Sequence, residues 1–520
     1  MNTVIRKCTA AGSIVLLALM PVNLSGAAQS PPAQSSQLPL HDYLQKSYED
    51  LFALAPSLRF SPADVETERQ ALKRGEDSCR SRFKDHSKLY GRQLDSARND
   101  LKKGGSELAD TQRHGLHCRI QNLELLRSEA DMLSGQAIPN AYDNLDAKLN
   151  LLLEWPEQNR QTLAAISDGS YNQRRWGDVK DIGFREVASG QRDDIKRGQE
   201  AVDELKRTGL LPPDIESKAV QDYVKKVADR VAQHSDLKVP LHVSVLQSKE
   251  INAFALPGGF LFIERGLLEA ADDESQLAGV IAHELAHVTA RHGARLMKRA
   301  TIAGIFYQAA QVAAIVLTGG VAGIGMYYAL QYGYYGLGLV LNLKLLGISR
   351  DYELEADQLG IQYAWSAGYD PRGFIRFFDK MATREGYVNG VSWFRTHPPF
   401  YARMVQAQRE IMFMPKMQDL MVQTAEFTQM KKDLEPVVAA AEQEEKEKPS
   451  LLLTKEEGCT PPRKIEYKAG QPIEQICSVE PRSLEPAENG GVGGKSGTDA
   501  SSIGPLSSAC APAGLQQLRP

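Results

Sequence analysis

The spacing of apolar residues changes near residue 215, and the two sides of this boundary predict different structures. Before it, charged residues dominate, apolar positions are sparse, and the stretch 64–103 has almost no β-branched residues. This pattern is typical of solvated amphipathic helices or a loose helical hairpin, with a turn at Gly104 and Gly105. We therefore expect 38–190 to be a charged helical region that acts as a spacer or binds an unknown partner protein.

Beyond residue 215 the chain alternates between helical and strand periods. The valine spacing in 218–235 predicts an amphipathic helix, and 239–247 alternates as a strand does. Residues 252–268, "NAFALPGGFLFIERGLL", predict a strand, a Pro-Gly-Gly turn, and a second strand that enters a helix. The acidic residues 272–275 predict the cap and first turn of the next helix.

A long segment, 300–343, contains no charged residue. Two membrane spans of about 20 residues would just fit, but glutamines, tyrosines and glycines dilute its apolar character. Three alternatives stay open: a spanning hairpin, a hairpin packed over the protein's own cleft, and a hairpin that contacts a membrane surface.

The two ends of the chain predict export and disorder. Residues 1–28 combine basic residues, a short apolar core and small residues, as a secretory signal peptide does, with a membrane anchor as the alternative. Residues 416–448 predict a helical extension. We expect 449–520 to be a disordered tail, because much of it is rich in Gly, Ser and Ala.

Composition and cysteine content narrow the class of protein. With 520 residues, 42% hydrophobic and 24% charged, the chain is expected to form two or three globular units. A net charge of −4 gives no indication of nucleic-acid binding. In an oxidising compartment, proximity along the chain favours disulfides Cys79–Cys118 and Cys459–Cys477, with Cys510 unpaired.

The motif "HELAH" carries the candidate chemistry. His283 and His287 are four residues apart, so on a helix their imidazoles can reach one metal ion. Glu284 follows His283 and is therefore rotated about 100° from it around the helix axis. From there its carboxylate can take a proton from water at the ion. Two histidines among apolar neighbours also need polar partners, and a metal ion is one.

Catalytic zinc requires a third protein ligand. The metzincin pattern fails, because Ala290 and Gly293 stand where it needs a glycine and a histidine. Otherwise a second helix must supply the ligand, and Glu353, Glu355 and Asp357 are the candidates about 70 residues downstream.

These motifs resemble those of one zinc-peptidase family. "HELAH", "SRDYELEAD", "NAFALPGGFLFIERGLL" and "THPPFYAR" occur in the order found in the gluzincins that include HtpX, the CAAX prenyl endopeptidases and BepA. The resemblance covers roughly 190–410 and is nearest to the exported BepA-like branch. It implies a mostly α fold with a small β-sheet (α+β), in which 191–415 form the metallopeptidase domain.

The resemblance also assigns roles. It implies one Zn²⁺ per chain, held by His283, His287 and Glu353, with Asp357 and Arg403 surrounding these ligands. His397 is expected either to stabilise the transition state or to act as a fourth, inhibitory zinc ligand. By contrast, we expect Glu355 to be a solvated helix charge and His292 to be structural.

The expected function is that of a zinc metalloendopeptidase acting on extended or misfolded polypeptides in cell-envelope quality control. Glu284 is the expected base. Asn252 and Ala253 would bind the substrate on an edge strand. The alternatives are a protease-silent chaperone with an autoinhibited zinc site, and an integral membrane protease. We expect an exported protein that is periplasmic or associated with a membrane through 300–343.

Overall fold

The fold is known from a computed structural model, which describes residues 38–170, 175–176, 179–180, 189–207, 211–297, 350–388, 401–447, 459, 462, 465 and 472–482. The expected signal peptide at 1–28, the apolar segment 300–343, His397 and Cys510 lie outside the described residues. Within the described part, the chain is mostly helical with a small three-stranded sheet, which confirms the predicted α+β class.

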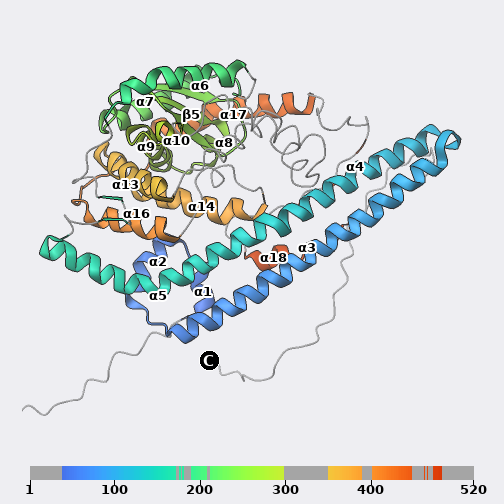
Figure 1. Ribbon diagram of the computed structural model, residues 1–520, viewed down its shortest axis with the longest axis horizontal. Helices are drawn as coiled ribbons and strands as arrows, with labels where there is room; N and C mark the ends of the chain where they lie inside the picture. Colours follow the sequence, from blue (N-terminus) through green and yellow to red (C-terminus); the bar gives the residue numbers. More distant parts are fainter. Residues whose placement is uncertain are drawn as a thin grey trace, which may run out of the picture.

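Helices form the described N-terminal region, as predicted, and α3, α4 and α5 are the longest of them (Figure 1). The helices are α1 (Leu40–Leu44), α2 (Tyr48–Leu54), η1 (Ala55–Ser57), α3 (Pro62–Gly104), η2 (Gly105–Glu107), α4 (Asp110–Met132), η3 (Leu133–Ala137) and α5 (Ile138–Asp168). Ser61 and Asp64 cap the start of α3 reciprocally. Gly105, with a φ of 45°, allows the chain to turn after it. α3 and α4 then pack against each other as a hairpin that projects from the rest of the molecule.

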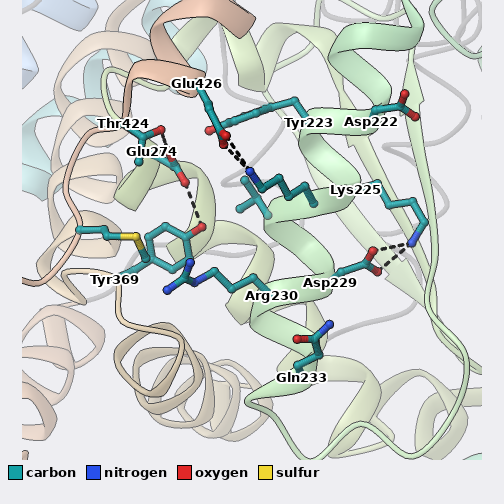
Figure 2. A pocket seen from close by; sticks show the side chains of 13 residues that line it. Asp222, Tyr223, Lys225, Asp229, Arg230, Gln233, Glu274, Tyr369, Thr424 and Glu426 are labelled. Carbon is teal, nitrogen blue, oxygen red and sulfur yellow. Dashed lines mark hydrogen bonds and ion pairs between the residues drawn. The ribbon is translucent and has the colours of Figure 1, made fainter.

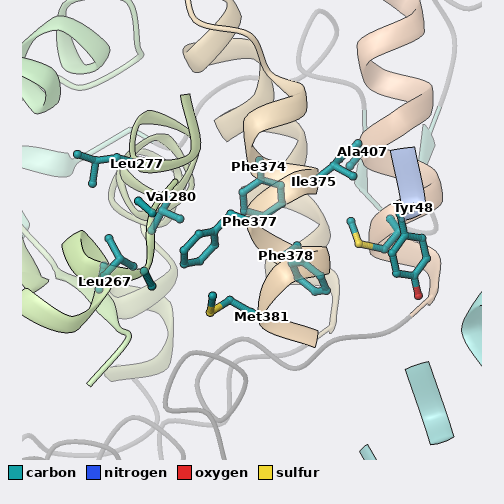
Figure 3. Packing of buried hydrophobic residues seen from close by; sticks show 14 of the residues in the cluster. Tyr48, Leu267, Leu277, Val280, Phe374, Ile375, Phe377, Phe378, Met381 and Ala407 are labelled. Atoms are coloured by element: carbon teal, nitrogen blue, oxygen red, sulfur yellow. The ribbon is translucent and has the colours of Figure 1, made fainter. Parts of the chain in front are cut away.

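This helical region shares a hydrophobic core with the rest of the protein. α2 and α5 pack against α14 (Arg372–Val388), and α5 also packs against α16 (Tyr401–Phe413). Figure 3 shows Tyr48 of α2 in the same hydrophobic cluster as Ala407 of α16 and the phenylalanines of α14. The region is therefore not a detached spacer, whereas binding of a partner protein stays a prediction.

The sheet has the strand order β3-β5-β4. β3 (His242–Leu246) runs parallel to β5 (Phe260–Glu264), and β4 (Ala253–Leu256) forms an antiparallel hairpin with β5. Gly258 and Gly259 make the hairpin turn with φ values of 84° and 93°, a region that other residues rarely adopt. The predicted strand–turn–strand is confirmed, and β4 lies at the edge of the sheet.

Helices surround this sheet and complete the second unit (Figure 1). They are η6 (Gln191–Asp194), α6 (Ile195–Arg207), α7 (Lys218–Gln233), α8 (Arg265–Ala270), α9 (Glu274–Thr289), α10 (His292–Met297), α13 (Arg350–Ser366), α14, α16 and α17 (Ala425–Glu447). A short ladder, β1 (Arg175–Trp176) with β2 (Val179–Lys180), lies between the two regions in sequence. Among the described residues, no helix is both long and apolar enough to cross a membrane.

The C-terminal segment returns to the helical hairpin, and the predicted disulfide pairing is wrong. Disulfides join Cys79 to Cys477 and Cys118 to Cys459, not the neighbours in sequence. Part of the range predicted to be disordered, 449–520, forms α18 (Ile473–Cys477), whose isoleucines are buried. Sequence proximity misled the pairing because Cys459 bonds to Cys118 of α4, whereas Cys477 in α18 bonds to Cys79 of α3.

We predict that peptide mapping without reduction will recover the cross-linked pairs Cys79–Cys477 and Cys118–Cys459. Each disulfide closes a loop of more than 300 residues, so the double variant Cys79→Ser/Cys477→Ser should lose roughly 3–5 kcal/mol of unfolding free energy. Recovery of Cys79–Cys118 as a linked peptide would contradict the fold described for the C-terminal segment.

Candidate metal centre

α9 carries the HExxH motif in the middle of the second unit. Asp273 caps its start, accepting a hydrogen bond from the backbone N of Gln276 at 3.0 Å. Every residue of the helix is buried. Its polar side chains must therefore find partners inside the protein.

Two glycines let neighbouring helices approach α9 closely. A Cβ on Gly360 of α13 would lie 2.8 Å from the backbone N of His283, and a Cβ on Gly279 of α9 would lie 3.0 Å from the backbone N of Phe374 in α14. Larger residues at these positions would force the helices apart. The close approach of α13 brings Glu353 to the histidines.

His283, His287 and Glu353 converge on one point. The Nε2 atoms of the two histidines are 3.1 Å apart. The Glu353 carboxylate oxygens lie 3.6 Å from His283 Nε2 and 3.5 Å from His287 Nε2. All three side chains are buried, and one donor atom from each lies within 4.8 Å of the others. Two imidazole nitrogens and a carboxylate oxygen match the ligand set of a catalytic zinc site, which keeps one position open.

Asp357 and Arg403 orient one side of this set. Asp357 Oδ1 lies 2.9 Å from His283 Nδ1, so Nδ1–H can donate to it and Nε2 is left for a metal ion. Arg403, fully buried, donates to both oxygens of Asp357 at 2.6 Å and lies 2.9 Å from Glu353 Oε2. One guanidinium thus holds the two carboxylates that bracket His283.

A parallel arrangement supports His287, and the sequence reasoning missed it. His292 Nδ1 lies 2.8 Å from His287 Nδ1, and His292 Nε2 lies 3.2 Å from Glu355 Oε2. One proton assignment satisfies every atom: His287 Nδ1–H donates to His292, and His292 Nε2–H donates to Glu355. Burial lowers the pKa of His292, which favours this neutral form despite the Glu355 carboxylate.

The expectation for Glu355 is therefore wrong, whereas the structural role expected of His292 stays a prediction. The Glu355 side chain is only 13% exposed and is not a solvated charge. His292 is buried and stacks on the Tyr352 ring with centroids 4.4 Å apart, and its imidazole contacts a candidate ligand, His287. His292 follows His287 by only five residues, and this short separation was the signal in the sequence that the two imidazoles could lie close together.

The charge balance at the site favours a cation. Burial opposes protonation of His283, but the carboxylates of Asp357 and Glu353 outweigh it and raise the pKa of His283 to about 9. In the metal-free chain, His283 therefore holds a proton at neutral pH. A metal ion bound at Nε2 would replace that proton, so metal affinity should rise with pH up to this pKa.

The remaining predicted site residues lie as follows. Glu284 is buried on α9, and its charge contributes to the raised pKa of Arg403, which burial alone would lower. Asn252 and Ala253 lie at the start of β4, and their side chains are buried. Any contact that they make with an extended substrate would therefore be through the backbone.

A separate cavity of about 470 Å³ lies near the start of α9 (Figure 2). Glu274 accepts hydrogen bonds there from Tyr369, at 2.9 Å, and from Thr424. Lys226, which also lines the cavity, pairs with Glu426. None of the metal-site residues lines this cavity, and its contacts tie the segment before α17 to the start of α9.

We predict that His292→Leu will weaken zinc binding about 10- to 100-fold, because it removes the acceptor for His287 Nδ1–H. Competition with a chromophoric chelator measures this affinity. His234→Leu is the matched control, since that histidine is exposed and its ring contacts the Arg230 carbonyl of α7, outside the candidate metal site. Equal zinc affinity in the His292 and His234 variants would contradict the orienting role.

Comparisons with known proteins agree with this geometry. Residues 218–411 match peptidase family M48. The chain is 30% identical over 216 residues to the beta-barrel assembly-enhancing protease of Escherichia coli K12, covering 41% of this chain and 43% of that protein. It is 34% identical over 182 residues to the mitochondrial metalloendopeptidase OMA1 of Schizosaccharomyces pombe, covering 34% of this chain and 48% of that protein.

The similarity has defined limits. The chain spans less than half the length of these curated relatives. The matched region contains α9, α13 and most of α16, and therefore includes the three convergent donors together with Asp357 and Arg403. Residues 218–411 thus match a domain of peptidase family M48, and they include the candidate metal ligands.

Proposed function

We propose that the protein is a zinc-dependent metalloendopeptidase. The observation that carries this proposal is the buried convergence of His283, His287 and Glu353, with Glu284 adjacent in the same motif. The family match and the names of the relatives support hydrolysis of peptide bonds. Zinc is the ion whose usual ligands best fit two imidazoles and one carboxylate.

In the proposed peptide hydrolysis, Glu284 and His397 have separate roles. A zinc ion held by His283, His287 and Glu353 would supply Lewis acidity, which would lower the pKa of the attacking water to about 7. Glu284 accepts the proton of the attacking water and passes it to the leaving amine. His397, outside the described residues, is the histidine of "THPPFYAR", a motif shared with the resembled family, and we assign it to stabilising the oxyanion.

The proposed substrates are extended or misfolded polypeptides. β4 pairs with β5 on one side and lies at the sheet edge in the described residues. An extended chain can add to such an edge by backbone hydrogen bonds, which do not depend on substrate side chains. The backbone of Asn252 and Ala253 would lie nearest the scissile bond.

The proposed compartment is the cell envelope, where the enzyme would serve protein quality control. The signal-peptide pattern in 1–28 and two disulfides support an oxidising, extracytoplasmic environment. Contact with a membrane through 300–343 is part of the proposal.

Glu284→Gln should retain zinc but lower the rate of casein cleavage by about 10²–10⁴-fold, because the amide cannot accept the proton. Zinc content by elemental analysis and cleavage by gel assay measure the two effects. Glu200→Gln on α6 is the control, since Glu200 is about half exposed and lies outside the site. Undiminished cleavage by the zinc-loaded Glu284 variant would refute the assignment of the base.

A further inference from the structure

One face of α14 contacts the metal-site residues. The Phe374 ring stacks on the His283 imidazole, with centroids 5.4 Å apart and planes 17° apart. One turn later, the Phe378 ring lies 4.9 Å from the Arg403 guanidinium. α14 thus contacts both a candidate ligand and the arginine that holds Glu353 and Asp357.

The next residue of α14, Asp379, is held by the N-terminal helical region. Its carboxylate accepts a hydrogen bond from the backbone N of Tyr48 at 3.3 Å and lies 3.8 Å from Lys148 Nζ. Lys148, with a side chain only 5% exposed, also donates to the Lys46 carbonyl at 2.7 Å. Burial lowers the pKa of Lys148 and raises that of Asp379, so each group depends on the other to remain charged.

A second contact joins the same region to the start of α9. Glu49 lies 3.4 Å from Arg372 and 3.7 Å from Arg376, both on α14. Arg376 in turn donates to Ser275 at 2.8 Å and lies 3.6 Å from Asp273, the cap of α9. The N-terminal region therefore contacts α14 at two points, and one of them continues to the HExxH helix.

The buried pair is more informative than the surface pair. Exposed ion pairs contribute little free energy, whereas a buried pair tolerates little displacement because either charge alone is strongly destabilising. Lys148–Asp379 therefore fixes the position of α14 along α5. A shift of α14 would move Phe374 and Phe378 relative to His283 and Arg403.

We propose that the N-terminal helical region positions the metal site, with Lys148 and Asp379 as positioning residues that act through α14 on His283 and Arg403. This inference rests on the proposed zinc site. It means that residues 38–168 affect the rate of the reaction by fixing the geometry of the metal ligands. It requires no partner protein.

The test uses the full mature chain loaded with Co²⁺, whose visible spectrum reports ligand geometry. Lys148→Met should alter the spectrum and speed Co²⁺ release to a chelator on the order of tenfold. With zinc, kcat for a peptide substrate should fall by a similar factor while KM changes less than about twofold. Asp379→Asn, which preserves side-chain shape, should give the same effects, and Lys148→Arg should restore most of the wild-type behaviour.

Arg69→Met is the matched control. Arg69 of α3 donates to Asp146 and Asn150 of α5 at 2.7 and 2.6 Å, so its loss weakens the same region without touching α14. It should lower the melting temperature and leave the Co²⁺ spectrum unchanged. If the Lys148 and Asp379 variants match Arg69→Met in spectrum, release rate and kcat, the positioning role is wrong. Because Co²⁺ release needs no substrate, absence of wild-type cleavage would refute the peptidase proposal separately.

Discussion

The structure of the metal centre depends on compensation of buried charge. Glu284, Glu353 and Asp357 are all at most 2% exposed, and Arg403 is the fully buried cation that contacts two of them. If all three carboxylates are ionised, two negative charges remain after Arg403 is counted. Unpaired charges in such a setting are costly, so a divalent cation would neutralise the group. In the metal-free chain the same carboxylates raise the pKa of His283, and a proton on its imidazole then supplies the compensating positive charge.

Close helix packing makes this concentration of charge possible. Gly360 and Gly279 allow α13 and α14 to approach α9, and the short distances fix the ligands before a metal ion arrives. Each candidate histidine ligand has its Nδ1 atom beside a buried partner, Asp357 for His283 and His292 for His287. Such preorganisation reduces the reorganisation needed when the ion binds. The helical region adds to it by packing on the far side of α14.

The sequence predicted the parts of the site that depend on local spacing. The four-residue interval of His283 and His287 follows from helix geometry, and motif resemblance supplied Glu353, Asp357 and Arg403. Glu355 could not be placed, because a charged residue on a helix gives no local sign of burial. The disulfide partners depend on how residues separated by more than 300 positions come together, and sequence proximity carries no information about that. The shared core of the two regions was hidden for the same reason: Tyr48 and Asp379, 331 positions apart, meet only in the folded chain.

The central claim is that one ion is held by two histidines of α9 and one glutamate of α13. Anomalous diffraction at the zinc absorption edge, from crystals of the zinc-loaded protein, tests it most directly. The account predicts one strong peak per chain, about 2.0–2.2 Å from His283 Nε2, His287 Nε2 and a Glu353 oxygen. A zinc peak elsewhere, or a peak that Glu353 does not contact, would contradict the account.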